Sequence, residues 1–223
     1  FKEEEDLLTY IFVDASASMA YPAADCKFEL AVATALAIAY VALSAGDRVM
    51  IRVLAGTGEP VEPGFVYGRH RIVELARRLR GIKPGGQYDF AQALVREMIS
   101  LRHAGKVFIV SDFLMLLNSI TKGLGLFMAA NMDLTAVQIL GGRELNGQGL
   151  DGDVEVVDAE SGEHLRVAVG AREREQYRQT MIRLTQEIKS FCLKRGLHYA
   201  LYTTDHDFQQ FFLRAVVDLG LAR

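Results

Sequence analysis

Hydrophobic positions along the chain follow two alternating patterns. Continuous apolar runs at residues 7–13 and 106–110 are typical of strands that are covered on both faces of a sheet. Residues 47–54 place arginines at alternate positions, which predicts a strand nearer an edge, and residues 133–140 and 196–204 predict two more strands. Apolar residues at helical spacing predict helices over residues 30–45, 71–80, 90–104, 118–131, 172–194 and 208–220.

The order of these elements, with strands and helices in alternation, predicts an α/β fold with a mostly parallel central sheet and helices on both faces. The segment 141–170 departs from this alternation. Its runs 153–158 and 164–169 flank a turn-forming stretch and predict a β-hairpin, inserted before the last helix–strand–helix unit. Because no long linker interrupts the pattern, we expect one domain over residues 1–223.

Composition narrows the function classes. A formal net charge of −3 argues against a nucleic-acid binder, which needs a basic surface. Cys26 and Cys192 fit neither a disulfide framework nor a zinc motif, so we expect a reducing compartment and a cytoplasmic location.

Residues 30–45 are nearly all apolar, but they are fewer than the roughly 20 that a bilayer requires. We therefore expect a helix buried against the sheet and no membrane span.

The start of the chain is acidic and polar, which is unlike a signal peptide. This charged stretch leads directly into the first strand, with no room for an earlier element. We therefore expect the chain to be a fragment of a longer protein.

Oxygen-bearing side chains follow two of the predicted strands. Asp14, Ser16 and Ser18 come directly after the first strand at every second position, and in an extended loop this spacing places them on one side. Ser111 and Asp112 end a later strand, and the carboxyl ends of parallel strands meet at one edge of a sheet. Hydroxyl and carboxylate oxygens suit Mg²⁺ or Mn²⁺, with Ca²⁺ as an alternative, and so few carboxylates leave the ion able to accept another from a partner.

The stretch DASAS at residues 14–18 resembles the DxSxS motif of the metal-ion-dependent adhesion site in von Willebrand factor A domains. More narrowly, residues 3–19, 27–49 and 106–113 resemble the bacterial family named domain of unknown function 58, and the resemblance extends over nearly the whole chain. It implies a Rossmann-like, three-layer von Willebrand factor A fold. It also implies metal ligands at Asp14, Ser16, Ser18 and Asp112, with the two aspartates often acting through water.

One position departs from the family pattern. The middle loop normally supplies a threonine, but here Tyr88 stands at that position. A tyrosine hydroxyl lies about 6 Å from its Cα, so it cannot replace threonine without a shifted loop. Gln87, Asp89 or a water would then act instead, or the site is weak or lacks metal. Asp89 also suits the N-cap of the next helix, and the alternative role of the first loop is to satisfy backbone groups in a tight turn.

These observations predict a non-catalytic module that binds a partner protein through a divalent metal ion. Met19, Gln87 and Tyr88 are expected on the binding crest around the ion. The family resemblance implies a MoxR-type AAA+ ATPase as the partner. The alternative hypothesis is an Mg²⁺-dependent enzyme of phosphoryl transfer with Asp14 as nucleophile, but a serine stands where such enzymes carry their second aspartate.

Overall fold

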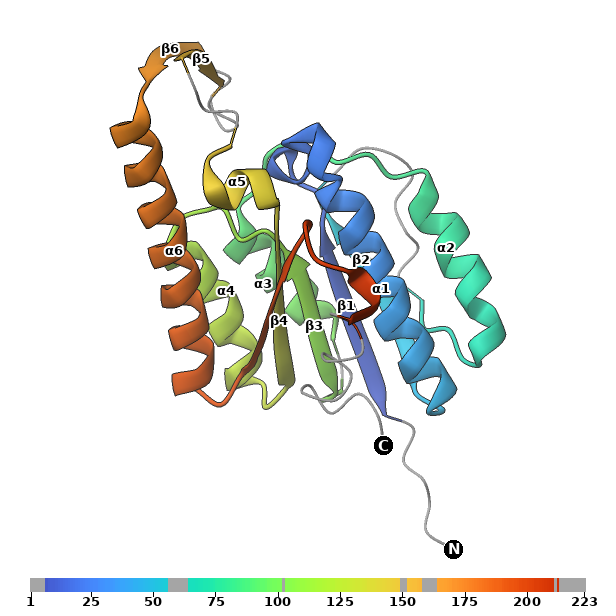
Figure 1. Ribbon diagram of the computed structural model, residues 1–223. Helices are drawn as coiled ribbons and strands as arrows, with labels where there is room; N and C mark the ends of the chain where they lie inside the picture. The colour runs from blue at the N-terminus through green and yellow to red at the C-terminus, as the bar shows by residue number, and fades with distance from the viewer. Residues whose placement is uncertain are drawn as a thin grey trace, which may run out of the picture.

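Five parallel strands make up the central sheet of the computed structural model, which describes residues 7–55, 64–101, 103–148, 152–157, 164–210 and 212. The strand order is β2-β1-β3-β4-β7, and every neighbouring pair is parallel (Figure 1). The predicted edge position of the second strand is thereby confirmed. The strands are β1 (Leu8–Asp14), β2 (Arg48–Leu54), β3 (Lys106–Ser111), β4 (Asp133–Leu140) and β7 (His198–Thr203).

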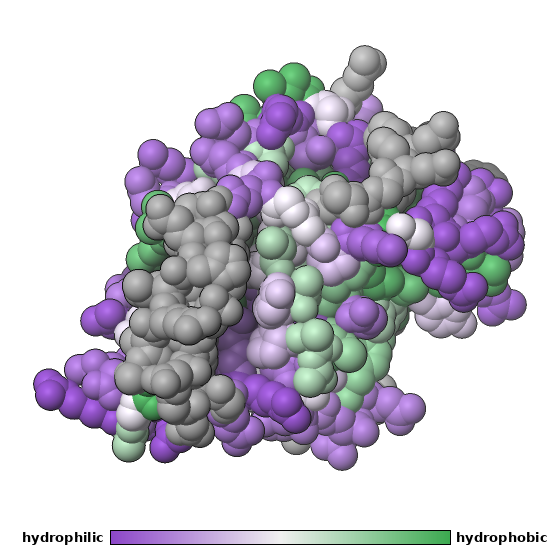
Figure 2. All heavy atoms as spheres, turned by 90° about the horizontal axis from the view of Figure 1, so that it is seen from above, coloured by the Kyte–Doolittle hydropathy of each residue, from purple (hydrophilic) through white to green (hydrophobic). Residues whose placement is uncertain are grey.

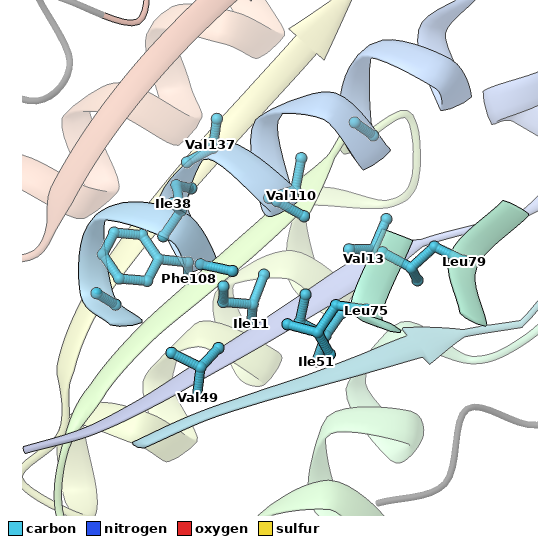
Figure 3. Packing of buried hydrophobic residues seen from close by; sticks show 14 of the residues in the cluster. Ile11, Val13, Ile38, Val49, Ile51, Leu75, Leu79, Phe108, Val110 and Val137 are labelled. Atoms are coloured by element: carbon cyan, nitrogen blue, oxygen red, sulfur yellow. The ribbon is translucent and has the colours of Figure 1, made fainter. Parts of the chain in front are cut away.

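Helices cover both faces of the sheet, as expected (Figure 1). Alternate residues of β1 point to opposite faces, so Ile11 joins one core and Phe12 the other. The first core packs the sheet against two helices, as Ile38 and Leu75 show in Figure 3. These helices are α1 (Lys27–Ser44) and α2 (Ile72–Arg80). The second core packs against α3 (Phe90–Ser100), α4 (Leu117–Ala129) and α6 (Ala171–Lys194).

Helix α1 is the apolar segment that was expected to lie against the sheet. Residues 23–44 are long and apolar enough to cross a membrane by length and composition alone, and half of the most apolar stretch is buried. Ala31, Ala35 and Ile38 lie in the first core, so the helix serves as a core helix of this fold. It begins at Lys27, three residues before the predicted start.

The segment between β4 and α6 contains the predicted hairpin and one element that was not predicted. Strands β5 (Gly152–Val157) and β6 (His164–Val169) pair antiparallel in a separate two-stranded sheet. A short helix, α5 (Gly142–Asn146), precedes them. The predicted last helix is helical at residues 208–210 and 212, and its remainder lies outside the described residues. Three single-turn 3₁₀ helices complete the described elements: η1 (Ala17–Ala20), η2 (Ala23–Asp25) and η3 (Arg69–Arg71).

Candidate metal centre

The candidate site lies at the carboxyl ends of β1 and β3, where the sheet order reverses. The chain passes from β1 to β2 on one side and later returns to β3 on the other side. In open α/β sheets such a switch point leaves a crevice where ligands bind. Asp14 ends β1 and Ser111 ends β3, so the loops that follow these two strands bring the predicted residues together.

The first loop holds one buried carboxylate and two adjacent hydroxyls. Asp14 is fully buried, and its Oδ1 accepts a hydrogen bond from the Ser16 N–H at 2.8 Å. Its Oδ2 accepts one from the Ser111 hydroxyl at 2.6 Å, which ties the ends of β1 and β3 together. The hydroxyl groups of Ser16 and Ser18 share a hydrogen bond with 3.1 Å between their oxygens, and both residues are partly exposed. The loop therefore presents two hydroxyls outward over a buried negative group.

Asp112, one residue beyond β3, is also fully buried. Its Oδ1 accepts a hydrogen bond from the Leu114 N–H at 3.1 Å, and its backbone carbonyl accepts one from the Gln138 side chain at 2.8 Å. The Tyr199 hydroxyl donates in turn to Gln138 at 2.7 Å. This chain of hydrogen bonds reaches from β7 through β4 and fixes the position of the Asp112 backbone.

The other side-chain oxygen of Asp112, Oδ2, is held by a lysine. Lys27 Nζ lies 2.9 Å from Asp112 Oδ2, and it also contacts both carboxylate oxygens of Glu144 at 2.9 and 3.0 Å. Lys27 is the first residue of α1, and Glu144 lies in α5. Neither residue was predicted from the sequence. The signal for Lys27 was its place in the first turn of a helix, where the helix dipole disfavours a cation that has no acidic partner.

The middle loop, residues 82–89, is joined to the first loop by backbone hydrogen bonds. The Gly85 N–H donates to the Ala15 carbonyl at 2.8 Å, and the Ala17 N–H donates to the Gly86 carbonyl at 3.1 Å. Gly86 has a φ of 76°, which a residue with a side chain rarely adopts, so the glycine permits this turn. The middle loop is therefore positioned directly beside Ser16 and Ser18.

Within that loop, Tyr88 and Asp89 have different surroundings. Asp89 caps α3, because its Oδ1 accepts a hydrogen bond from the Gln92 N–H at 3.0 Å. The Tyr88 hydroxyl is buried and makes no hydrogen bond within the part of the chain that the structure describes. Burial, and next the Asp14 carboxylate, raise the pKa of this hydroxyl. Tyr88 thus brings an unsatisfied donor close to Asp14, whereas the cap role of Asp89 is confirmed.

An open hollow of about 430 Å³ lies in front of these loops. Its polar lining includes Ser16, Ser18 and Gln87, and its apolar lining includes Met115 and Leu116. Figure 2 shows this end of the molecule, with apolar and weakly polar surface in the middle and hydrophilic surface to the right.

Met19 was expected on the binding crest, the surface around Ser16, Ser18 and the middle loop, but the expectation is wrong. Its side chain is 1% exposed and packs in the first core beneath the loop. Gln87 and Tyr88, the other two residues expected on the crest, both line the hollow.

Burial sets the charge state of the site. Burial first, and then the nearby charge of Asp112, raise the pKa of Asp14 to about 6. Hydrogen bonds from Ser111 and Ser16 offset only part of this effect. Two negative groups held close together in a buried setting favour the binding of a proton or of another cation.

The donor set fits a small divalent ion. Octahedral Mg²⁺ has ligands at about 2.1 Å, so neighbouring ligands lie about 3.0 Å apart. The Ser16 and Ser18 oxygens lie at a similar distance, 3.1 Å, in the hydrogen bond that they share. Among the described residues, no group of three or more His, Cys, Asp or Glu side chains is placed to hold a metal. The family resemblance implies that an ion here would bind the two hydroxyls directly and that Asp14 and Asp112 would act through water.

Comparisons with known proteins agree with this architecture. The chain is similar to the conserved hypothetical protein BatB from Bacteroides thetaiotaomicron, with 11% identity and a TM-score of 0.56 over 97% of this chain and 100% of that one. An aerotolerance-related membrane protein from Bacteroides fragilis gives 13% identity and a TM-score of 0.56 over the same shares. The pilus adhesin SpaC from Lactobacillus rhamnosus GG gives 10% identity and a TM-score of 0.53 over 97% of this chain and 30% of SpaC.

At these identities the likeness concerns the fold alone, which is the von Willebrand factor A-like α/β fold expected from the sequence. No curated protein matches the chain. The family model described as protein of unknown function DUF58 matches residues 1–187. The chain therefore belongs to the DUF58 family, in which it forms a von Willebrand factor A-like domain.

Proposed function

We propose that this domain is a non-catalytic module that binds a partner protein through a divalent metal ion at its crest. The observation that supports this most directly is the Ser16 and Ser18 hydroxyl pair, 3.1 Å apart, above the buried Asp14. An ion that is held mainly by neutral hydroxyls keeps much of its positive charge. It would take an acidic side chain of the partner as a further ligand, and the open hollow leaves room for that side chain.

The geometry favours binding over phosphoryl transfer. Asp14 would be the nucleophile of such an enzyme, but it is fully buried and both of its oxygens accept hydrogen bonds. A nucleophile must be accessible to the substrate, and the buried Asp14 carboxylate is not. Asp112 is equally buried, and its Oδ2 is paired with Lys27, so it is no better placed to reach a substrate.

The partner that the family resemblance implies is a MoxR-type AAA+ ATPase, and a cytoplasmic location would suit such a pairing. The hollow offers an apolar wall at Met115 and Leu116 beside the hydroxyls. A partner segment with an acidic side chain next to an apolar one would match both parts of the hollow.

The experiment is a binding assay between this domain and a MoxR-type ATPase from the same genome, with Mg²⁺ or with a chelator. We expect binding in Mg²⁺ and a loss of tenfold or more, that is, about 1.4 kcal/mol or more, for the chelator and for Asp14→Asn. The control is Ser119→Ala, because Ser119 lines the same hollow but lies outside the hydroxyl pair. Binding that is equally strong with chelator and in Asp14→Asn would contradict the proposal.

A further inference from the structure

Lys27 is the most deeply buried cation that contacts the candidate site. Its side chain is fully buried, and it contacts the fully buried Asp112 and the nearly buried Glu144. A buried ammonium is costly unless acidic partners surround it. Two carboxylates within 3.0 Å of Nζ supply those acidic partners, so the side chain stays charged.

The place of Lys27 in the chain separates this role from ordinary helix stabilisation. It begins α1, where exposed backbone N–H groups already carry partial positive charge. The lysine is therefore unfavourable for the helix itself, and its contacts are long-range. Asp112 is 85 residues away in the sequence and Glu144 is 117 residues away. Lys27 connects α1, the end of β3 and α5 at one point.

Charge gives this cluster a direct relation to the metal ion. Asp14, Asp112 and Glu144 are three carboxylates, and Lys27 is one ammonium, so their formal charges sum to −2. One divalent ion neutralises that sum. Removal of Lys27 would make the summed formal charge more negative by one, and removal of the Glu144 carboxylate would make it less negative by one.

We propose that Lys27 is a built-in cation that sets the affinity of the crest for divalent metal by holding Asp112 Oδ2 and balancing Glu144. This inference rests on the proposed metal-dependent function. Lys27 repels the incoming ion and occupies an oxygen that would otherwise attract it, so the affinity stays moderate. A moderate affinity leaves the ion dependent on the partner's carboxylate as a further ligand.

The test is a calorimetric titration of Mn²⁺ into the metal-free domain and three variants. We expect Lys27→Met to bind Mn²⁺ about tenfold more tightly and Glu144→Gln about tenfold more weakly, because each changes the local charge by one in a buried setting. The double variant Lys27→Met/Glu144→Gln restores the sum of −2 and should bind like the wild type. Circular dichroism before each titration shows whether each protein is folded, and the double variant carries the test if Lys27→Met alone unfolds.

A purely structural role predicts a different pattern. If Lys27 only positions Asp112, Lys27→Met and Glu144→Gln will both weaken Mn²⁺ binding, and the double variant will bind most weakly, which overturns the inference. Equal affinities in all four proteins, or no binding in any of them, overturn it as well. Binding by Lys27→Met alone would contradict the moderate wild-type affinity that the inference assigns, and it would contradict the proposed metal-dependent function as well.

Discussion

At the residue scale, the acidic groups near the crest have three separate roles. Asp14 ties the first loop to β3, Asp112 pairs with Lys27, and Asp89 caps α3. The two serine hydroxyls are hydrogen-bonded to each other and line the open hollow, so they are the groups that could face an ion directly. The middle loop adds the buried Tyr88 hydroxyl, which makes no hydrogen bond among the described residues. An ordered water beside Asp14 would give that donor an acceptor.

The raised pKa of Asp14 predicts how the metal-free domain responds to pH. Its ordinary value of 3.8 rises to about 6 in the fold, so the folded state holds the proton more tightly than the unfolded chain does. The resulting stabilisation is present below the lower pKa, and it is lost as the pH rises through about 6. Two pKa units correspond to about 3 kcal/mol in the free energy of unfolding.

Urea unfolding in chelator across this pH range measures the effect. The control is Asp14→Asn, which keeps the shape of the side chain but cannot ionise, so this part of the pH dependence should disappear. A wild-type curve with the same pH dependence as the variant would show that Asp14 does not titrate in this range. Added Mg²⁺ should restore the stability lost above pH 6, because an ion that binds only the folded state stabilises it.

At the element scale, the sequence patterns predicted the strands and the longer helices but not the contacts between them. Continuous apolar runs mark buried strands whatever their neighbours are, which is why β1 and β3 were predictable. The five-residue helix α5 has too few turns for a hydrophobic period, so nothing in its sequence marked it. The Lys27–Glu144 pair joins residues 117 positions apart, and only the fold brings them together.

Two glycines of α4 form a matched pair for testing how closely α4 packs against α3. A Cβ at Gly123 would lie 2.8 Å from Leu94 Cδ1 and 3.0 Å from the Phe90 ring, whereas a Cβ at Gly125 would meet nothing within 4 Å. We expect Gly125→Ala to stabilise the domain by about 1 kcal/mol through helix propensity. Gly123→Ala gains the same propensity but overpacks the core at a cost of about 1–3 kcal/mol.

Thermal unfolding of the two variants separates the two effects. Gly125→Ala should melt above the wild type, and Gly123→Ala should melt clearly below Gly125→Ala. Melting temperatures that rise equally in both variants would show that α3 and α4 can move apart at little cost.

At the scale of the whole molecule, the sheet lies between two hydrophobic cores. The candidate site lies at the carboxyl ends of its central strands. Ile11 and Phe12, neighbours on β1, belong to opposite cores, so β1 is fixed from both sides. Asp14 ends this rigid strand and supports the loop that carries Ser16 and Ser18. The spacing of these three residues and their place after a buried strand were sufficient to predict the first loop. The burial of Met19 was not predictable, because it depends on how η1 folds back over the first core.

Ser16 and Ser18 are the residues that we propose hold a divalent ion at the crest. The measurement that tests this proposal most directly is calorimetric titration of Mg²⁺ and Mn²⁺ into the wild-type domain and into Ser16→Ala/Ser18→Ala, with Ser119→Ala as the control within the same hollow. We expect saturable binding of one ion per chain in the wild type and the control, and a loss of tenfold or more, about 1.4 kcal/mol, in the double variant. Equal binding in all three proteins, or none in the wild type, would contradict it.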